Sequence, residues 1–159
     1  EIYTLSLHDA LPIFQKEMVH FQQAWAQKSF KIALDCLTKI LGLGIGLTPT
    51  GDDFITGLLA SFSALQQLPS NFQQLAVLAK ERTNAVSYAE IHEAVNERFS
   101  QLVQRVFLSI ESGNTNEMAQ AVSALEEVGS TSGSDILCGI IFGLKLFCEE
   151  NNHDNSNSN

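Results

Sequence analysis

Apolar residues recur at intervals of three and four along most of the chain, the spacing that places them on one face of an α-helix. These series are Met18, Phe21 and Trp25; Ile32, Ala33, Leu37, Ile40 and Leu41; Leu75 and Leu78; and Phe99, Leu102, Val106 and Ile110. Strand-like alternation of apolar and polar positions is hard to find. The pattern predicts an all-α fold, a compact bundle of about seven helices joined by short loops.

Signals for helix ends agree with this pattern. Asn114 and Glu117 have the spacing of a capping box, in which two side chains satisfy free N–H groups at the start of a helix. Gly113, directly before them, suits the end of the preceding helix. We therefore expect one helix to end and the next to begin at this point.

The two ends of the chain differ from the part between them. The opening EIYTLSLHDALPI, residues 1–13, resembles the translation of a sequencing adapter, so we exclude it from the fold. We expect residues 14–150 to form one helical domain, the C-terminal part of a longer protein. The polar segment 151–159 has no apolar anchors and is predicted to be disordered.

Composition narrows the classes of partner. The formal net charge is -9 at pH 7, and the acidic residues are spread along the helices, so we expect no nucleic-acid partner. Cys36, Cys138 and Cys148 form no CxxC pair, and no apolar run approaches the roughly 18 residues of a membrane span. We interpret the chain as a cytoplasmic protein with buried thiols and no membrane partner.

One short pattern occurs twice. TGDDFITGLL at 50–59 and SGSDILCGII at 132–141 share a hydroxyl residue, a glycine, an aspartate and a second glycine at a constant offset of 82. One interpretation is a pair of capping boxes, in which Asp53 and Asp135 each lie three residues after the capping hydroxyl. The other is a pair of ligand-binding loops. Gly57 and Gly139 lie inside the helices that follow, where we expect them to permit close approach, so that both loops face one pocket.

The first copy follows a glycine-rich stretch, GLGIGLTP, residues 42–49. Gly42, Gly44 and Gly46 leave backbone N–H groups free to converge on an anion at a helix N-terminus. The spacing fits neither the dinucleotide fingerprint GxGxxG nor the Walker motif, whose lysine is missing. A glycine helix end followed by a turn is the alternative interpretation.

Three motifs carry a resemblance to a known family: LGLGIGLTPTGDDFITGLL, then TNAVS, then GSTSGSDILCGI. With them, most of residues 29–148 is similar to the AllH-like family, the small subunit of oxamate carbamoyltransferase. The resemblance implies a transferase subunit that works with two larger partner subunits. The reaction it implies interconverts oxalurate plus phosphate and oxamate plus carbamoyl phosphate, in the catabolism of allantoin and other purine-derived ureides.

The chemistry of carbamoyl phosphate suits the two loops. Its anionic phosphate needs N–H and hydroxyl donors, and its carbamoyl NH2 needs acceptors. We therefore predict Asp53 and Asp135 as catalytic residues. The predicted substrate-binding residues are Gly44, Gly46, Thr48, Thr50, Gly51, Asp52, Ser132 and Gly133 in the loops, with Thr83 and Ser87, which match a hydroxyl pair of the family.

Two carboxylates beside a phosphate repel it unless a cation intervenes or the carboxylates point away. Asp52 and Asp53 offer the oxygen ligands that Mg2+ prefers, so a bound magnesium ion and an outward orientation are alternative interpretations. Two alternatives also stand for function. One is a non-catalytic assembly subunit whose glycine loops dock the larger subunits, and the other is a metal-dependent hydrolase, which only the aspartates suggest.

Overall fold

The computed structural model describes residues 7–156, and within that range it contains eight α-helices, one 3-10 turn and no strand. The helices are α1 (Leu7–Ala26), α2 (Phe30–Ile40), α3 (Thr50–Ala64), α4 (Gln74–Arg82), α5 (Ala85–Val95), α6 (Gln101–Ser112), α7 (Thr115–Glu126) and α8 (Ser132–Ser156), with the turn η1 at Ser70–Gln73. The predicted all-α fold is confirmed, with one helix more than the expected number.

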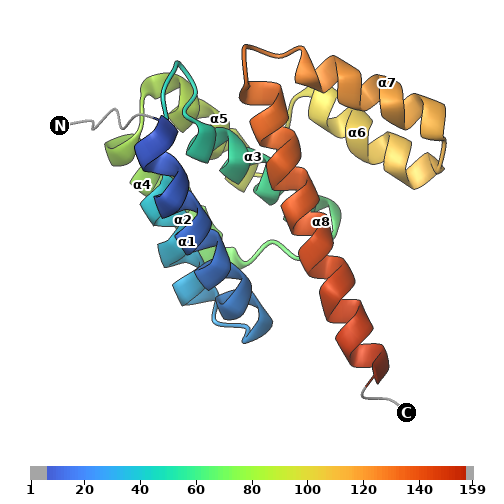
Figure 1. Ribbon diagram of the computed structural model, residues 1–159, viewed down its shortest axis with the longest axis horizontal. Helices are drawn as coiled ribbons and strands as arrows, with labels where there is room; N and C mark the ends of the chain where they lie inside the picture. The colour runs from blue at the N-terminus through green and yellow to red at the C-terminus, as the bar shows by residue number, and fades with distance from the viewer. Residues whose placement is uncertain (1–6, 157–159) are drawn as a thin grey trace.

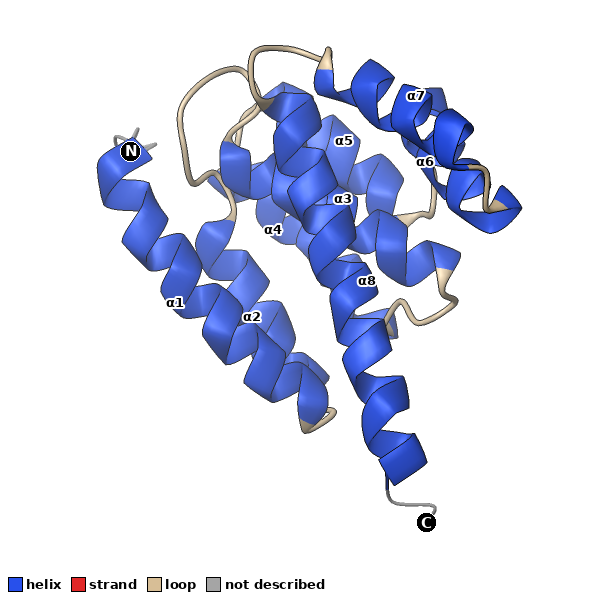
Figure 2. Ribbon diagram, turned by 45° about the vertical axis from the view of Figure 1, so that its right-hand side comes forward, coloured by secondary structure: helices blue, strands red, loops and turns tan. Residues whose placement is uncertain are grey.

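α3 is the central helix of the molecule. It runs beside α8, with α1 and α2 on one side of this pair and the α6–α7 hairpin on the other (Figures 1 and 2). Of its 15 residues, 11 are buried, among them Asp52 and Asp53. A helix that is covered on all sides needs apolar residues around its whole circumference. The run FITGLLASF, residues 54–62, meets that requirement.

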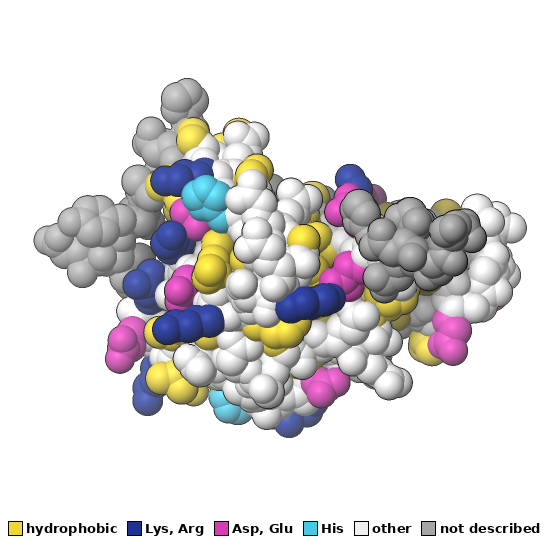
Figure 3. Space-filling model, turned by 90° about the horizontal axis from the view of Figure 1, so that it is seen from below, with side chains coloured by type: hydrophobic (Ala, Val, Ile, Leu, Met, Phe, Trp, Pro, Cys, Tyr) yellow, Lys and Arg dark blue, Asp and Glu magenta, His cyan; other side chains and the backbone are white. Residues whose placement is uncertain are grey.

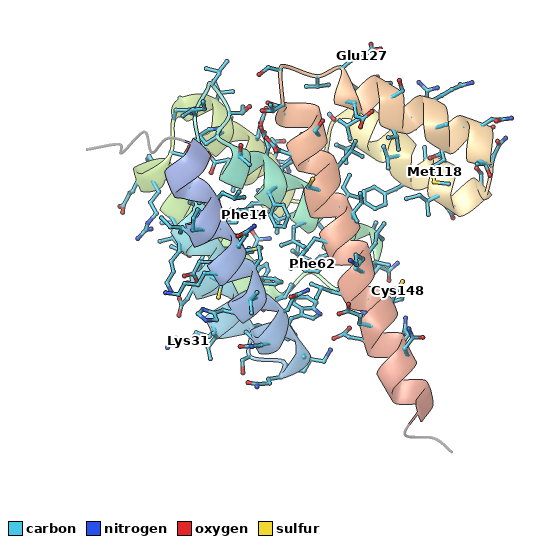
Figure 4. The ribbon with its side chains drawn as sticks, viewed as in Figure 1. Phe14, Lys31, Phe62, Met118, Glu127 and Cys148 are labelled. Atoms are coloured by element: carbon cyan, nitrogen blue, oxygen red, sulfur yellow. The ribbon has the colours of Figure 1, made fainter. Side chains whose placement is uncertain are left out.

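Two hydrophobic clusters hold the bundle together. The larger cluster contains residues of every element from α1 through α5, with Leu146 of α8. In it, Trp25 stacks on Phe62 at a ring-centroid distance of 4.2 Å, and Phe14 lies edge-on to Phe54 at 4.8 Å. In Figure 4, Phe14 lies on α1 and Phe62 lies in the interior of the molecule. The smaller cluster joins α6, α7 and α8 around Leu125. α3 contributes to both clusters, with Phe54 in the larger and Ala60 in the smaller.

The chain ends differ from our expectations. α1 begins at Leu7, so residues 7–13, which we excluded from the fold, are helical. α8 continues to Ser156, so residues 151–156 are helical where we predicted disorder. The core residue Leu146 anchors α8, and extending an existing helix is much easier than starting one. Residues 1–6 and 157–159 lie outside the described residues.

Several local predictions can be compared directly with the structure. The Asn114 side chain accepts the N–H groups of Asn116 and Glu117, and Gly113 has a φ of 68°, so the helix boundary predicted there is confirmed. Cys36 is buried, but Cys138 and Cys148 are exposed. The prediction of buried thiols is therefore wrong for two of the three cysteines.

The surface carries charges of both signs. On the face shown in Figure 3, Lys and Arg side chains are interspersed with Asp, Glu and apolar side chains. No helix within the described range is both long enough and apolar enough to cross a membrane.

Candidate functional site

The two copies of the repeated pattern meet in the structure. α3 and α8 lie in parallel, with their N-termini at the same end of the molecule (Figure 1). A Cβ atom on Gly57 would lie 1.9 Å from the carbonyl oxygen of Ile136, and one on Gly139 would lie 2.1 Å from that of Phe54. Under the 82-residue repeat, Gly57 matches Gly139 and Phe54 matches Ile136, so the two contacts are equivalent. A local two-fold pseudo-symmetry therefore relates the two helices. The structure thus contains the close approach that we expected at both glycines.

Gly51 and Gly133 also occupy matching positions, one residue into α3 and α8. A Cβ atom on either would lie 2.0 Å or less from a carbonyl oxygen of the helix before its loop. Their N–H groups donate to the carbonyls of Leu43 and Val128. These two N–H groups are therefore used inside the fold. That Gly51 and Gly133 bind the substrate stays a prediction.

Asp52 connects the glycine-rich loop to the turn between α4 and α5. Its side chain is 1% exposed, accepts the N–H of Gly42 at 2.7 Å and accepts the hydroxyl of Thr83. Burial raises the pKa of Asp52, while these bonds and the Ser87 hydroxyl lower it. Asp52 and Thr83 therefore tie the loop to this turn. The substrate-binding role of Asp52, Thr83 and Ser87 stays a prediction.

Asp52→Ala is expected to destabilise the fold by about 2 to 3 kcal/mol, because it leaves the Gly42 N–H and the Thr83 hydroxyl without an acceptor in a buried place. Urea unfolding measures this loss. Asp35→Ala is the matched control, since Asp35 lies on the exposed face of α2 and its loss is expected to cost about 0.5 kcal/mol or less. Equal losses of stability in the two variants would contradict a structural role for the Asp52 hydrogen bonds.

Asp53 occupies a different environment from its neighbour. It is 1% exposed, and neither carboxyl oxygen has a hydrogen-bond partner. The hydroxyls of Thr48 and Ser132 lie close to it but are bonded to each other at 2.6 Å. Burial raises the pKa of Asp53 from an ordinary 3.8 to about 7, aided by the charges of Glu90 and Asp135 and opposed by the two hydroxyls. The carboxyl group is thus poised between its two protonation states near neutral pH.

Asp135 is the counterpart of Asp53 on α8. Burial raises its pKa, and the hydroxyls of Thr50 and Thr131 lower it. Its Oδ2 atom is buried without a partner. Each aspartate therefore faces a hydroxyl of the other copy, Asp53 facing Ser132 and Asp135 facing Thr50. Thr50 is the first residue of α3, whose N-cap is Pro49 without a side-chain cap bond, so the first predicted capping box is absent.

Part of the glycine-rich loop has free N–H groups. Gly44 and Gly46 have φ angles of 122° and 104°, which favour glycine. Among the hydrogen bonds of residues 7–156, none involves the N–H of Gly44, Gly46 or Thr48. The Asn84 side chain donates to the Leu47 carbonyl at 2.8 Å and ties the loop to the start of α5. These three N–H groups therefore have no partner among the described residues.

Asp52 and Asp53 do not act as a pair. Asp52 faces Gly42 and Thr83, whereas Asp53 faces Thr48 and Ser132. In the part of the chain that the structure describes, no three His, Cys, Asp or Glu side chains are grouped as metal ligands. The two carboxylates therefore face different groups, and the choice between a bound magnesium ion and an orientation away from the anion stays open.

Three residues that contact or influence the site were not predicted from the sequence: Glu90, Thr131 and Asn84. Asn84 had a local signal, because asparagine is a preferred N-cap residue and its side chain accepts the N–H groups of Val86 and Ser87. Glu90 had none. The Glu90 charge raises the pKa of Asp53, but the two residues lie on different helices, which only the tertiary fold brings together.

A family model described as "Oxamate carbamoyltransferase subunit AllH" matches residues 40–144. This range runs from the end of α2 into α8 and includes both loops and the α3–α8 contact. The chain therefore belongs to the AllH family of oxamate carbamoyltransferase subunits, and the resemblance identified from the motifs is confirmed. No solved structure matches the chain.

Proposed function

We propose that the loops at the N-termini of α3 and α8 form part of the carbamoyl-transfer site of the complex, with Asp53 as its acid–base group. The observation that carries the proposal is the Asp53 carboxyl group, which is buried without a partner and has a pKa of about 7. A group with a pKa near the working pH holds and releases a proton with equal ease, as general acid–base catalysis requires. Each carboxyl oxygen of Asp52, by contrast, accepts a hydrogen bond.

The proposed reaction converts oxalurate and phosphate into carbamoyl phosphate and oxamate. A phosphate oxygen bonds to the carbamoyl carbon, the bond from that carbon to the amide nitrogen breaks, and the nitrogen takes a proton. Asp53 supplies this proton and regains one from the attacking phosphate, so the step balances. The free N–H groups of Gly44, Gly46 and Thr48, with the positive ends of two parallel helices, receive the phosphate, and Asp135 accepts from the carbamoyl NH2.

The proposal also includes the cellular setting. The complex would act in the cytoplasm, in the catabolism of allantoin and related ureides, with two larger partner subunits. The family description supports partner subunits as such, since it names a subunit of a transferase.

Thermal unfolding of the 159-residue chain with oxalurate, carbamoyl phosphate, oxamate or phosphate tests direct binding. A ligand at about 100 times its dissociation constant is expected to add about 2.7 kcal/mol to stability. Ser132→Ala should abolish this increase, because it removes the hydroxyl beside Asp53. Ser134→Ala, the same change on the exposed side of the same helical turn, should preserve it.

The assembly-subunit alternative rests on a separate observation. Ile45 and Leu47, at the tip of the glycine-rich loop, are 57% and 72% exposed, which suits docking to another subunit. If no ligand stabilises the folded chain, direct binding is contradicted and the assembly role is favoured.

A further inference from the structure

The two copies of the repeated pattern differ in the length of the loop before each helix. In both copies the second residue of the helix closes the loop by donating its N–H group to a carbonyl oxygen near the start of the loop. These two hydrogen bonds join Gly51 to Leu43 and Gly133 to Val128. The closed loop contains residues 44–50 in the first copy and 129–132 in the second. The glycine-rich loop is therefore the longer one, and its additional backbone has no counterpart in the second copy.

The tip of the longer loop is held from outside the loop. Residues 45–47 are exposed. Among the described hydrogen bonds, their backbone takes part in one, which the Leu47 carbonyl accepts from Nδ2 of Asn84 at 2.8 Å. Thr48, the next residue, is held by its side chain, whose hydroxyl is bonded to that of Ser132. Because fixing the backbone of a loop costs conformational entropy, the Asn84 bond is what opposes disorder at the tip.

Asn84 uses both ends of its amide group. Its Oδ1 atom accepts the N–H groups of Val86 and Ser87 and caps α5, while its Nδ2 atom donates to the Leu47 carbonyl. The oxygen and the nitrogen of an amide lie in one plane, so the cap also fixes the direction of the NH2 group. Turning the NH2 away from the loop would break both capping bonds. The start of α5 therefore aims the donor at the loop.

The turn between α4 and α5 also holds the base of the loop, but in a different setting. The Thr83 hydroxyl donates to Asp52, which also accepts the N–H of Gly42, and Asp52 is buried. The Asn84 bond to the loop tip lies at the surface. Loss of a surface hydrogen bond has little effect on global stability. Asn84 is thus placed to control the tip of the loop separately from the stability of the fold.

We propose that Asn84 is a positioning residue, which holds residues 44–48 in the conformation that presents their free N–H groups. The inference rests on the proposed function and deepens it, because those N–H groups receive the phosphate in that proposal. Without the Asn84 bond the tip samples other conformations. The apparent dissociation constant of a ligand rises in proportion as the binding-competent fraction of the loop falls.

NMR relaxation of the nitrogen-15-labelled full chain tests whether Asn84 orders the loop. The order parameters of the Gly46 and Leu47 N–H groups are expected to lie near 0.85 in the wild type, the value of roughly rigid backbone, and below about 0.6 in Asn84→Asp. Aspartate is a good N-cap residue but has no N–H to donate. Asn114→Asp, the same change at the N-cap of α7, should leave the loop ordered. Unchanged loop order in Asn84→Asp would overturn the proposal.

Calorimetric titration of the full chain with inorganic phosphate tests the consequence for binding. Asn84→Ser retains a capping side chain and adds no charge beside the anion. It is expected to weaken phosphate binding by about threefold to tenfold, the effect of losing one hydrogen bond. Its thermal midpoint should shift by less than about 2 °C, since the cap persists. A merely structural role would lower the midpoint and leave the dissociation constant unchanged. Asn114→Ser, the matched control, should leave the dissociation constant unchanged.

The two measurements separate this inference from the proposed function. Loss of loop order with unchanged phosphate affinity would show that the Asn84 bond does not serve binding, and would overturn its positioning role. If the wild-type chain binds no phosphate, the proposed function falls. The order parameters would then still decide whether Asn84 holds the loop. Loss of order together with weaker binding, in variants that keep their thermal midpoint, would support both proposals.

Discussion

Replacing Gly57 or Gly139 with alanine is expected to destabilise the protein severely or to prevent folding. A Cβ atom would lie 1.9 Å from the Ile136 carbonyl oxygen in the first case and 2.1 Å from the Phe54 carbonyl oxygen in the second. Both oxygens belong to the backbone of the opposing helix, so neither can swing aside. The α3–α8 pair must separate, and we expect a loss of about 3 kcal/mol or more, the upper end of the usual cost of overpacking.

The direction of the stability change distinguishes a close helix contact from an unhindered helix. In an unhindered helix the same substitution is stabilising by about 1 kcal/mol, because alanine favours helix more than glycine does. Urea unfolding of Gly57→Ala and Gly139→Ala gives the loss directly, and far-ultraviolet circular dichroism shows whether a variant folds at all. Gly113→Ala is the control, since a Cβ there meets nothing within 4 Å and only its φ of 68° opposes alanine. A stable Gly57→Ala protein would contradict the helix contact described here.

Asp53→Asn is expected to stabilise the protein at about pH 8 and to have much less effect at about pH 5. Burial raises the pKa of Asp53 from 3.8 to about 7, so the folded state holds the proton more tightly than the unfolded state does. The stability that this proton brings is complete below pH 3.8 and is lost as the pH rises through about 7. Above that pH the ionised carboxylate costs up to about 4 kcal/mol, which asparagine avoids.

Unfolding free energies of the wild type and Asp53→Asn at the two pH values measure this difference. It is expected to grow in favour of asparagine as the pH rises. Glu93→Gln is the control, because hydrogen bonds from Arg98 hold the pKa of Glu93 at about 2, so its titration lies below both pH values. The difference between that variant and the wild type should therefore stay constant. A constant difference for Asp53→Asn as well would show that Asp53 does not titrate in this range.

Local sequence signals accounted for most of the helices and for the α6–α7 boundary. The capping asparagine at 114 and the glycine at 113 act within a few residues of themselves, so their pattern predicted the boundary without the fold. Ile32 shows the limit of this reasoning. It matches the apolar series of α2 but is exposed, because periodicity shows which residues share a face but not how wide the buried stripe is.

The roles of the polar residues were harder to predict. Asp52 and Asp53 are adjacent and chemically identical, and sequence reasoning placed both in the site. Asp52 is bonded to Gly42 and Thr83, while Asp53 has no partner. Neighbouring residues at the start of a helix point about 100° apart, so each enters a different environment. The groups that surround each aspartate belong to loops that are distant from it in the chain.

The sequence by itself determined the helical fold, the family, the repeated loops and the two glycines that bring α3 and α8 together, because each depends on residue types at short, regular spacings. Only the tertiary structure decided which aspartate is hydrogen-bonded and which is unpartnered, and which loop N–H groups stay free. The physical reason is that burial and hydrogen bonding depend on what surrounds a group in space. For Asp53 those surroundings are Ser132 and Glu90, which other helices supply.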